Sequence, residues 1–486
     1  MTSGAFHPNV DGPNPPSRFD LLVARARRAA TLADKLARNA IRRPRRLALE
    51  LERALERISA DPPAMPLREG HPHAASEVAA AGPPHDFAMF DVMPMCAPLN
   101  ITATDVDGDA PHLNIVLPGV KMAAMSGGPN TALAIGYRLA EMGVPIRFIS
   151  ANAPPDADHA PLFDHFMKIS GVSRRLENVS IIDAHDRTKR HNFGRNDLFF
   201  ATAWWTAQMV RRIIPGFRNS KFIYLVQDFE PGLHEFSSYY ALAMETYELD
   251  FLPVVNHPIL ADHFLAERVG QFAKLGTSRD LIILDPAIDR AHFYPAPKAP
   301  GDRKRLLFYA RPSVAKRNMF ELGVIALRKA VASGLFEDGA WDFIGMGEPF
   351  TPVALGGGRV LECAPWLGFH SYAEQMRSAD LLLSLMFAPH PSYPPLEMAA
   401  CGGVAVTNEF GVKTAARLAE ISGNIFAGPA TVEGVVECLT RAMAFLPNTD
   451  QRLHNASSLR APGAWAESFS KVIPPLYDFW RAAAGR

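Results

Sequence analysis

Short apolar runs alternate with amphipathic segments through the middle of the chain. HLNIVLPG (residues 112–119) has the length and composition of a buried strand, and it leads through a glycine turn into a helical pattern at 122–143 and a second strand at 145–150. Two more strand-like runs follow at 197–205 and 221–229, each leading into a helix or a turn. Strands that alternate with helices predict a parallel sheet covered on both faces.

The alternation restarts after a stretch rich in proline and glycine. Residues 281–305 have the composition of an interdomain connection. Beyond it, strands are predicted at 305–312, 341–347, 380–387 and 403–408, and helices at 318–333, 372–378 and 395–401. We therefore expect two doubly wound α/β domains, at residues 111–295 and 296–465. A helix at 466–486 ends the chain, and its return to the first domain is left open.

A different pattern precedes these domains. Residues 1–17 are rich in Pro, Gly and Asn, which favours an unfolded leader, and residues 59–110 form a Pro/Ala-rich linker and entry. Residues 18–58 are amphipathic, interrupted at Pro44, and carry 12 Lys and Arg against 5 Asp and Glu. Such a basic helical segment fits peripheral contact with an anionic membrane surface, and it equally fits a solvated helix or an oligomer contact.

Composition narrows the class of protein. The 486 residues are 48% hydrophobic, and 50 basic residues balance 50 acidic ones, so no global field favours nucleic acid. The four cysteines lie far apart without metal-ligand spacing, which predicts reduced core thiols. No apolar run reaches the roughly 18 residues that cross a bilayer, and the first residues lack a signal core. We therefore expect a cytoplasmic protein, peripheral on the inner face of the membrane if residues 18–58 bind there.

Two basic residues follow the first strand of the second domain. In LLFYARPSVAKRN, Arg311 and Lys316 fall on the loop between a strand and a helix predicted to begin near Asn318. Open α/β sheets bind ligands at this carboxyl edge. A guanidinium fork, an ammonium and a helix N-terminus together suit a diphosphate. The alternative is a pair of solvent-exposed loop charges.

An acidic residue follows two prolines that suit a helix start. PSYPPLEMAACGG puts Glu397 in the first turn of the predicted helix, where a carboxylate can accept hydrogen bonds from both hydroxyls of a ribose. A carboxylate that merely complements the helix dipole is the alternative.

The motifs taken in order resemble those of retaining GT-B glycosyltransferases. The resemblance covers residues 112–475 and rests on PAID-x3-F-x-P, R-x4-K, FIGMGE, WLGFHSYAEQMRSADLLLSL and PPLEMAACGGVAV, together with SGGPNTALAIGYRLAEMGVPIRF near the start. Within that group, LVQDFEPGLHEFSSYYALAMETY, ARPSVAKRNMFELG and FAPHPSYPPLEMAACGG look like the WsaF-type rhamnosyltransferases, which use dTDP-L-rhamnose. The resemblance implies two Rossmann-like domains with a cleft between them, retention of anomeric configuration and no requirement for a metal or other cofactor.

The same resemblance implies roles for individual residues. Arg311 and Lys316 become the diphosphate clamp and Glu397 the ribose ligand. The remaining donor-binding candidates come from the same motifs: Gly127, Gly128, Trp366, Leu367, Gly368, His390 and Tyr393. One departure is clear, because the second Glu that the group carries eight positions before the ribose ligand is Pro389 here. Either His390 or backbone groups replace it, or the donor sugar differs from the usual hexoses.

The acceptor side is predicted to lie in the first domain. Asp228 and Glu230 of QDFEPG follow a strand, and the related enzymes place a polar residue here, so Asp228 is the candidate for orienting the acceptor hydroxyl. A turn-forming Asp is the alternative. Trp204 and Trp205 can stack on a sugar or pack in the core. TDVDGD (104–109) and GGGR (356–359) are expected to be turns rather than a metal or phosphate site.

The expected function is transfer of a sugar, L-rhamnose from dTDP-L-rhamnose, onto a growing cell-surface glycan or a lipid-linked saccharide. A nucleotide-sugar epimerase of the same fold and a non-catalytic sugar-binding protein are the alternatives. Donor, acceptor, linkage and oligomeric state are not fixed by these residues.

Overall fold

We analysed a computed structural model of the protein. It describes residues 93–485, except 106–109, 126, 276, 278–280, 299–300, 302, 313–315, 338–339 and 365–366. The predicted leader, the basic segment at 18–58 and the linker up to residue 92 therefore lie outside the described residues. No described helix is long and apolar enough to cross a membrane.

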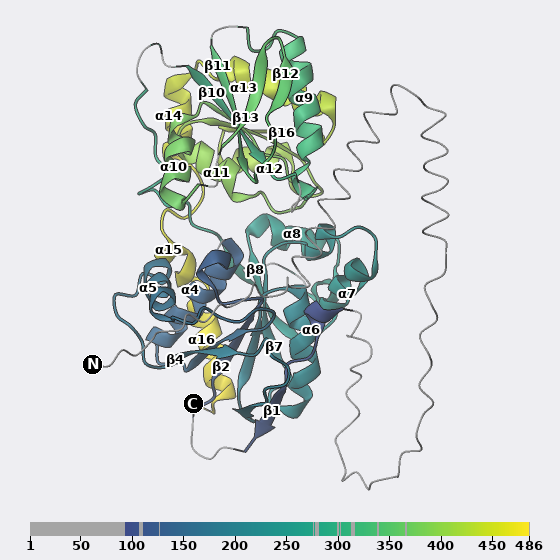
Figure 1. The fold of residues 1–486 in the computed structure, drawn as a ribbon, viewed down its shortest axis with the longest axis vertical. Coiled ribbons are helices and arrows are strands. Elements are labelled where there is room, and N and C mark those ends of the chain that lie inside the picture. Colours follow the sequence, from purple (N-terminus) through teal and green to yellow (C-terminus); the bar gives the residue numbers. More distant parts are fainter. Residues whose placement is uncertain are drawn as a thin grey trace, which may run out of the picture. The chain divides into compact units, whose positions relative to one another are not determined.

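The first domain is a parallel seven-stranded sheet flanked by helices (Figure 1). Its strands, in spatial order, are β4 (Val179–Asp183), β3 (Ile146–Ser150), β2 (Leu113–Leu117), β6 (Leu198–Ala201), β7 (Phe222–Val226), β8 (Phe251–Asn256) and β9 (Ile282–Leu284). The helices are α4 (Gly127–Glu141), α5 (Ala160–Ser170), α6 (Trp204–Ile213), α7 (Ser238–Thr246) and α8 (Pro258–Ala266). A separate parallel pair joins β1 (Ile101–Thr104) to β5 (His191–Gly194).

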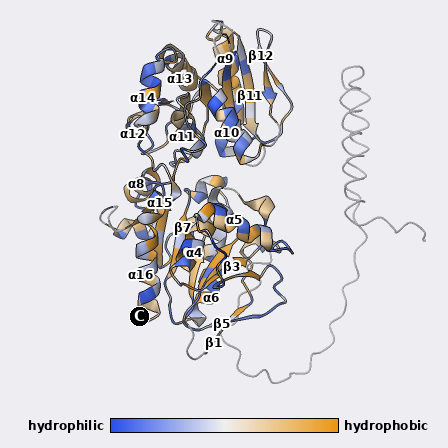
Figure 2. Ribbon diagram, turned by 90° about the vertical axis from the view of Figure 1, so that its left-hand side faces the viewer, coloured by the Kyte–Doolittle hydropathy of each residue, from blue (hydrophilic) through white to orange (hydrophobic). Residues whose placement is uncertain are grey.

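Helices cover both faces of this sheet, and burial of its apolar residues stabilises it. β2, β6 and β7 are buried at every position, as expected of parallel strands covered on both sides. Figure 2 shows the sheet as mostly hydrophobic. The last helix of the chain, α16 (Ile473–Ala483), belongs to this core: Trp480 is buried, and its Nε1 donates to the carbonyl of Pro111 at 2.8 Å.

The second domain repeats the architecture. Its strands, in spatial order, are β12 (Val353–Gly356), β13 (Arg359–Cys363), β11 (Trp341–Gly347), β10 (Lys304–Ala310), β14 (Leu381–Leu383), β15 (Val404–Asn408) and β16 (Ile425–Gly428). The helices are α9 (Phe320–Ala332), α10 (Phe369–Ser378), α11 (Tyr393–Ala400), α12 (Ala415–Ile421), α13 (Val432–Phe445) and α14 (Thr449–Ser457), whereas α15 (Trp465–Ser470) packs with α16 on the core of the first domain. All pairs are parallel except β12 with β13.

Both sheets reverse their strand order at one point. In the first domain the order runs outward in both directions from the pair β2 and β6, and in the second from β10 and β14. The carboxyl ends of such a pair are the ligand-binding edge of a doubly wound sheet. Arg311, directly after β10, lies at this edge in the second domain, and the N-terminus of α4, which follows β2, lies at it in the first.

Two local expectations are wrong, and the expected turn at GGGR is confirmed. The strand predicted to reach Trp205 ends at Ala201, because Trp204 and Trp205 begin α6. Glu397 is not in the first turn of its helix: α11 starts at Tyr393, since prolines are accommodated in a first turn whose N–H groups need no partner. GGGR is the turn of the β12–β13 hairpin, with positive φ at all three glycines, as a turn requires. The four cysteines are free, and three of them are buried.

Candidate functional site

Arg311 is held at the end of β10 by a carboxylate from the neighbouring strand. Its Nε donates to Glu348 Oε1 at 3.3 Å, and Glu348 is buried directly after β11. Gly347 makes this approach possible: it has φ +129°, and a Cβ there would stand 2.6 Å from the carbonyl oxygen of Ala310 and 3.0 Å from Arg311 Cγ. The FIGMGE motif therefore positions the guanidinium that the sequence assigned to a diphosphate.

The segment after Arg311 links the two domains. Lys316, Arg317 and Asn318 form a short 3-10 helix, in which the side chain of Lys316 lies outside the described part of the chain. The guanidinium of Arg317 forms an ion pair with Asp228, which follows β7 in the first domain. Asp228 is 6% exposed, and its other oxygen accepts from the Phe229 N–H at 2.9 Å. Burial raises the pKa of Asp228, and the charge of Arg317 opposes this.

Lys413, on the loop after β15, adds a second cation near Asp228. The residue is fully buried, and its Nζ donates to the carbonyl of Met386 at 2.9 Å. Asn408 fixes Met386 by accepting from its N–H at 2.7 Å and donating to its carbonyl at 3.1 Å. Burial lowers the pKa of Lys413 to about 7, and the charge of Asp228 acts in the opposite direction.

Glu397 is partly exposed and hydrogen-bonded on one side. Tyr372, from α10, donates its hydroxyl to Glu397 Oε2 at 2.5 Å. Burial raises the pKa of Glu397 to about 7, and the bond from Tyr372 partly offsets the shift. Glu397 lies one turn after Tyr393 on α11, so the two side chains share a helix face.

The loop before α11 carries strain and buried polar groups. Ser392 has φ +70° and ψ 155°, a region that is essentially reserved for glycine. His390 is buried, and its Nδ1 accepts from the Ser392 N–H at 2.9 Å. Burial lowers the pKa of His390 to about 3, so the ring is neutral. Tyr393 accepts at 3.3 Å from the side chain of Asn256, the last residue of β8 in the first domain.

The N-terminus of α4 presents the two predicted glycines. Gly127 is exposed, and its carbonyl accepts from Thr131 Oγ1 at 3.0 Å. Gly128 lies against Gln227: an added Cβ would stand 2.8 Å from Gln227 Oε1. A side chain at residue 128 would therefore require the Gln227 amide to move.

Glu230 and Trp204 make structural contacts inside the first domain. Glu230 Oε2 accepts from the backbone N–H of Trp204 at 2.6 Å and from the Tyr224 hydroxyl at 3.0 Å, so this carboxylate caps α6. Burial raises the pKa of Glu230 to about 8. The Trp204 indole is fully buried, with its Nε1 3.1 Å from His234 Nε2. These contacts are those of the core-packing alternative for Trp204.

The structure therefore brings together residues from several strand ends. Asp228 of the first domain pairs with Arg317 and acts on the charge of Lys413, Asn256 of the first domain bonds Tyr393, and Arg311 pairs with Glu348 inside the second domain. Trp366 lies outside the described residues, whereas Leu367 and Gly368 precede α10. Sequence reasoning missed Arg317, Glu348, Lys413, Asn256 and Gln227. For Glu348 and Lys413, the position after a predicted strand was a partial signal; no strand was predicted before Asn256, and Gln227 lay inside one.

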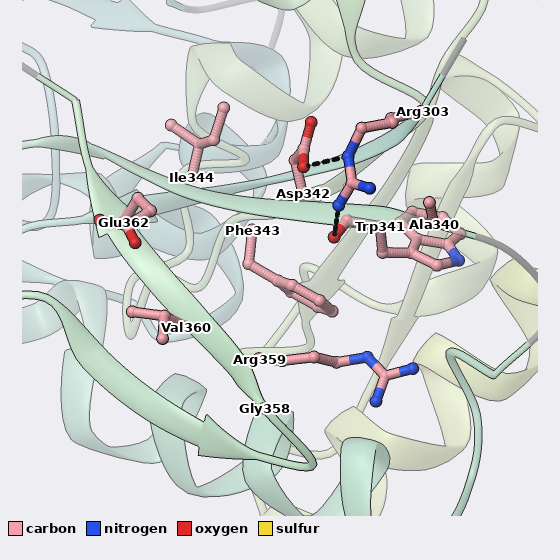
Figure 3. Close-up of a pocket in the computed structure, with 10 residues that line it drawn as sticks. All are labelled: Arg303, Ala340, Trp341, Asp342, Phe343, Ile344, Gly358, Arg359, Val360 and Glu362. Atoms are coloured by element: carbon pink, nitrogen blue, oxygen red, sulfur yellow. Dashed lines mark hydrogen bonds and ion pairs between the residues drawn. The ribbon is translucent and has the colours of Figure 1, made fainter.

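Two pockets lie at the opposite edge of the second sheet. The first, of ≈ 520 Å³, surrounds the start of β11, where Arg303 Nε donates to Asp342 Oδ1 at 2.7 Å (Figure 3). The second, of ≈ 660 Å³, shares Arg303 and Asp342. Both lie at the amino end of β10 or β11, away from the edge where doubly wound sheets bind ligands. Within the described residues, no three His, Cys, Asp or Glu side chains gather as a metal site requires.

Comparisons with known proteins found similar sequences and structures. The O-antigen biosynthesis protein RfbC of Myxococcus xanthus is 34% identical over 240 residues, which are 49% of this chain but only 16% of that protein. Sucrose-phosphate synthase from Thermosynechococcus elongatus superposes with a TM-score of 0.52 at 14% identity, covering 77% of this chain and 100% of that one. HepE of Anabaena, in complex with UDP, gives a TM-score of 0.48 at 14% identity over 76% and 98% of the two chains.

Family models match both domains. The WsaF N-terminal domain matches residues 112–257, and the WsaF C-terminal domain matches residues 304–440. Together they cover more than half of the 486 residues, in the same order as the two sheets. The chain therefore belongs to the WsaF family and has the GT-B fold of glycosyltransferases.

Proposed function

We propose that this protein is a glycosyltransferase that moves L-rhamnose from dTDP-L-rhamnose onto a growing cell-surface glycan or lipid-linked saccharide. The observation that carries the proposal is the placement of Arg311, Arg317 and Lys413 on the loops that follow β10 and β15, with Glu397 on α11 after β14, at the carboxyl edge of the second sheet. The name of the relative RfbC supports a surface glycan as the acceptor. The rhamnosyl donor rests on the likeness to WsaF-type enzymes.

The donor half of the reaction requires charge neutralisation. The bond between the anomeric carbon and the diphosphate oxygen breaks, and the nucleoside diphosphate leaves with the bonding electrons. Arg311, oriented by Glu348, and Lys316 neutralise the leaving group, in the way that preorganised cations stabilise a transition state. Side-chain cations take this role here in place of a metal. Glu397 accepts hydrogen bonds from the ribose hydroxyls.

The acceptor half requires a positioned hydroxyl. Asp228 is buried at the end of β7, where one oxygen pairs with Arg317 and the other accepts from the Phe229 N–H. Each carboxylate oxygen has a second lone pair, which is proposed to orient the acceptor hydroxyl. The hydroxyl oxygen forms the new bond to the anomeric carbon, and its proton passes to the departing phosphate. Retention of configuration follows from the family likeness.

Release of dTDP tests the proposal directly. Wild type is incubated with dTDP-L-rhamnose, with and without saccharide acceptors, and free dTDP and products are measured. We expect acceptor-dependent release, and we expect Arg311→Ala to lower turnover about 100- to 1000-fold. Near-normal turnover in Arg311→Ala and Lys316→Ala would refute the assignment. Free or epimerised sugar formed without acceptor would indicate an epimerase instead.

A further inference from the structure

Two side-chain amides lie next to each other at the ends of neighbouring strands. β7 and β8 are parallel with Val226 opposite Val255, so Gln227 and Asn256 occupy the next paired positions. Gln227 Nε2 donates to the Thr202 carbonyl at 3.3 Å, and Asn256 Nδ2 donates to the Tyr393 hydroxyl at 3.3 Å. Both amide oxygens are buried without a hydrogen-bond partner in the described part of the chain.

An unpartnered donor lies beside them. His390 is 4% exposed, and its ring centroid is 5.8 Å from that of Tyr393. Because Nδ1 accepts from the Ser392 N–H, the neutral ring carries its proton on Nε2. That Nε2 is also buried without a partner among the described residues. The Asn256 amide and the His390 ring therefore both lie at the Tyr393 side chain, and Gln227 occupies the position paired with Asn256 on the neighbouring strand.

Burying these polar atoms without hydrogen-bond partners costs free energy. A buried polar atom without a partner loses its bonds to water and gains none in return, so native proteins retain few of them. The backbone here is strained as well: His257, which follows Asn256, has φ +100°, and Ser392 has φ +70°. Orphaned polar atoms and strained backbone together mark places where a ligand completes the arrangement.

We propose that Gln227, Asn256 and His390 form a subsite that binds the hydroxyl groups of the donor sugar. The two amide oxygens accept hydrogen bonds from sugar hydroxyls, and the His390 Nε2–H donates to a hydroxyl oxygen. All three groups are uncharged, which suits a neutral polyol rather than a phosphate. A sugar hydroxyl that enters here takes the place of the Tyr393 hydroxyl in the 3.3 Å hydrogen bond from Asn256.

The position of these three residues relative to the proposed nucleotide site supports a sugar as the ligand. The inference rests on the proposed function, in which Glu397 binds the ribose. Tyr393 is one turn before Glu397 on α11, and Gly128 at the N-terminus of α4 touches Gln227. A sugar extending from the diphosphate is therefore within reach of the three groups. They also supply hydrogen bonds where Pro389 replaces the acid that the sequence comparison led us to expect.

Separate binding of nucleotide and nucleotide-sugar tests the subsite. Asn256→Leu and Gln227→Met, made individually, remove one amide oxygen each at similar side-chain volume. Titration calorimetry with dTDP and with dTDP-L-rhamnose, and with UDP and UDP-glucose as a second pair, measures both affinities. We expect each variant to bind the nucleotide-sugar at least about 10-fold more weakly while its affinity for the nucleoside diphosphate stays within about 2-fold of wild type.

Gln271→Met is the matched control. Gln271 lies in the same domain and also donates one hydrogen bond to a backbone carbonyl, that of Phe251 at 3.0 Å, so its loss should leave both affinities unchanged. Equal weakening of both ligands in Asn256→Leu and Gln227→Met, or of neither, would overturn the subsite. If wild type binds no nucleoside diphosphate, the proposed function itself fails, and the subsite fails with it.

Discussion

At the residue scale, the contact between Asp228 and Arg317 joins the predicted acceptor side to the cations of the second domain. Burial raises the pKa of Asp228, and the neighbouring guanidinium limits the rise. The ion pair therefore controls how readily the carboxylate is available to orient an acceptor hydroxyl.

Removal of Arg317 should change the pH dependence of catalysis. In Arg317→Gln the pKa of Asp228 loses its main opposing influence and rises further, so the acidic limb of the kcat/KM profile moves to higher pH. A pH–rate series on wild type and Arg317→Gln measures this shift. Arg417→Gln breaks the ion pair with Asp262 and serves as the control, which should not shift the limb. Identical acidic limbs in all three proteins would exclude Asp228 from the reaction.

Some site residues could be predicted from the sequence and others could not. Arg311 and Glu397 were accessible because each stands in a recognisable strand–loop–helix context. Arg317, Lys413 and Asn256 were not, because their roles depend on loops from different strands and domains meeting in space. Glu348 was within a quoted motif, but its bond to Arg311 depends on the register between β10 and β11.

At the element scale, a buried carboxylate caps the N-terminus of α6. Glu230 accepts from the first N–H of the helix, yet burial raises its pKa from the ordinary 4.5 to about 8. Between these two values the folded state binds a proton that the unfolded chain does not. The contribution of Glu230 to stability is therefore full below pH 4.5 and is lost as the pH rises to about 8.

Glu230→Gln should remove this pH dependence. Glutamine keeps the shape of the side chain but cannot ionise. The free energy of unfolding of the variant, relative to that of wild type, should therefore increase by about 2 to 4 kcal/mol as the pH rises from 5 to 8. Urea unfolding of both proteins across that range measures the difference. A constant difference across the range would mean that Glu230 does not titrate there.

The apolar runs predicted the central strands of both sheets, with errors at their ends, but missed most of the outer strands; β9 lies within the stretch 281–305 that was expected to be a connection. β10, β11 and β15 fall where the hydrophobic runs lie, because strands covered on both faces are mostly apolar. The strand predicted to reach Trp205 was too long, since an apolar run does not mark where a strand passes into a buried helix. β1 and β5 are among the missed strands, because they are short and mostly half-buried.

At the scale of the whole molecule, two repeats of one architecture are tied together by polar contacts and by the last helix. The bond from Asn256 to Tyr393 and the two ion pairs formed by Arg317 and Arg417 cross from one domain to the other. The final helix α16 returns the chain to the core of the first domain. The sequence suggested two domains from the restart of the alternation, but such long-range contacts leave no local pattern.

The central claim is that the second domain binds a thymidine nucleotide through Arg311 and Glu397. A thermal-shift panel of dTDP, UDP, GDP and ADP on wild type and on Glu397→Gln tests it most directly, because a ligand at about 100 times its dissociation constant adds about 2.7 kcal/mol of stability. We predict the largest shift with dTDP and a smaller one in Glu397→Gln. A response to GDP alone, or equal responses in both proteins, would contradict the account.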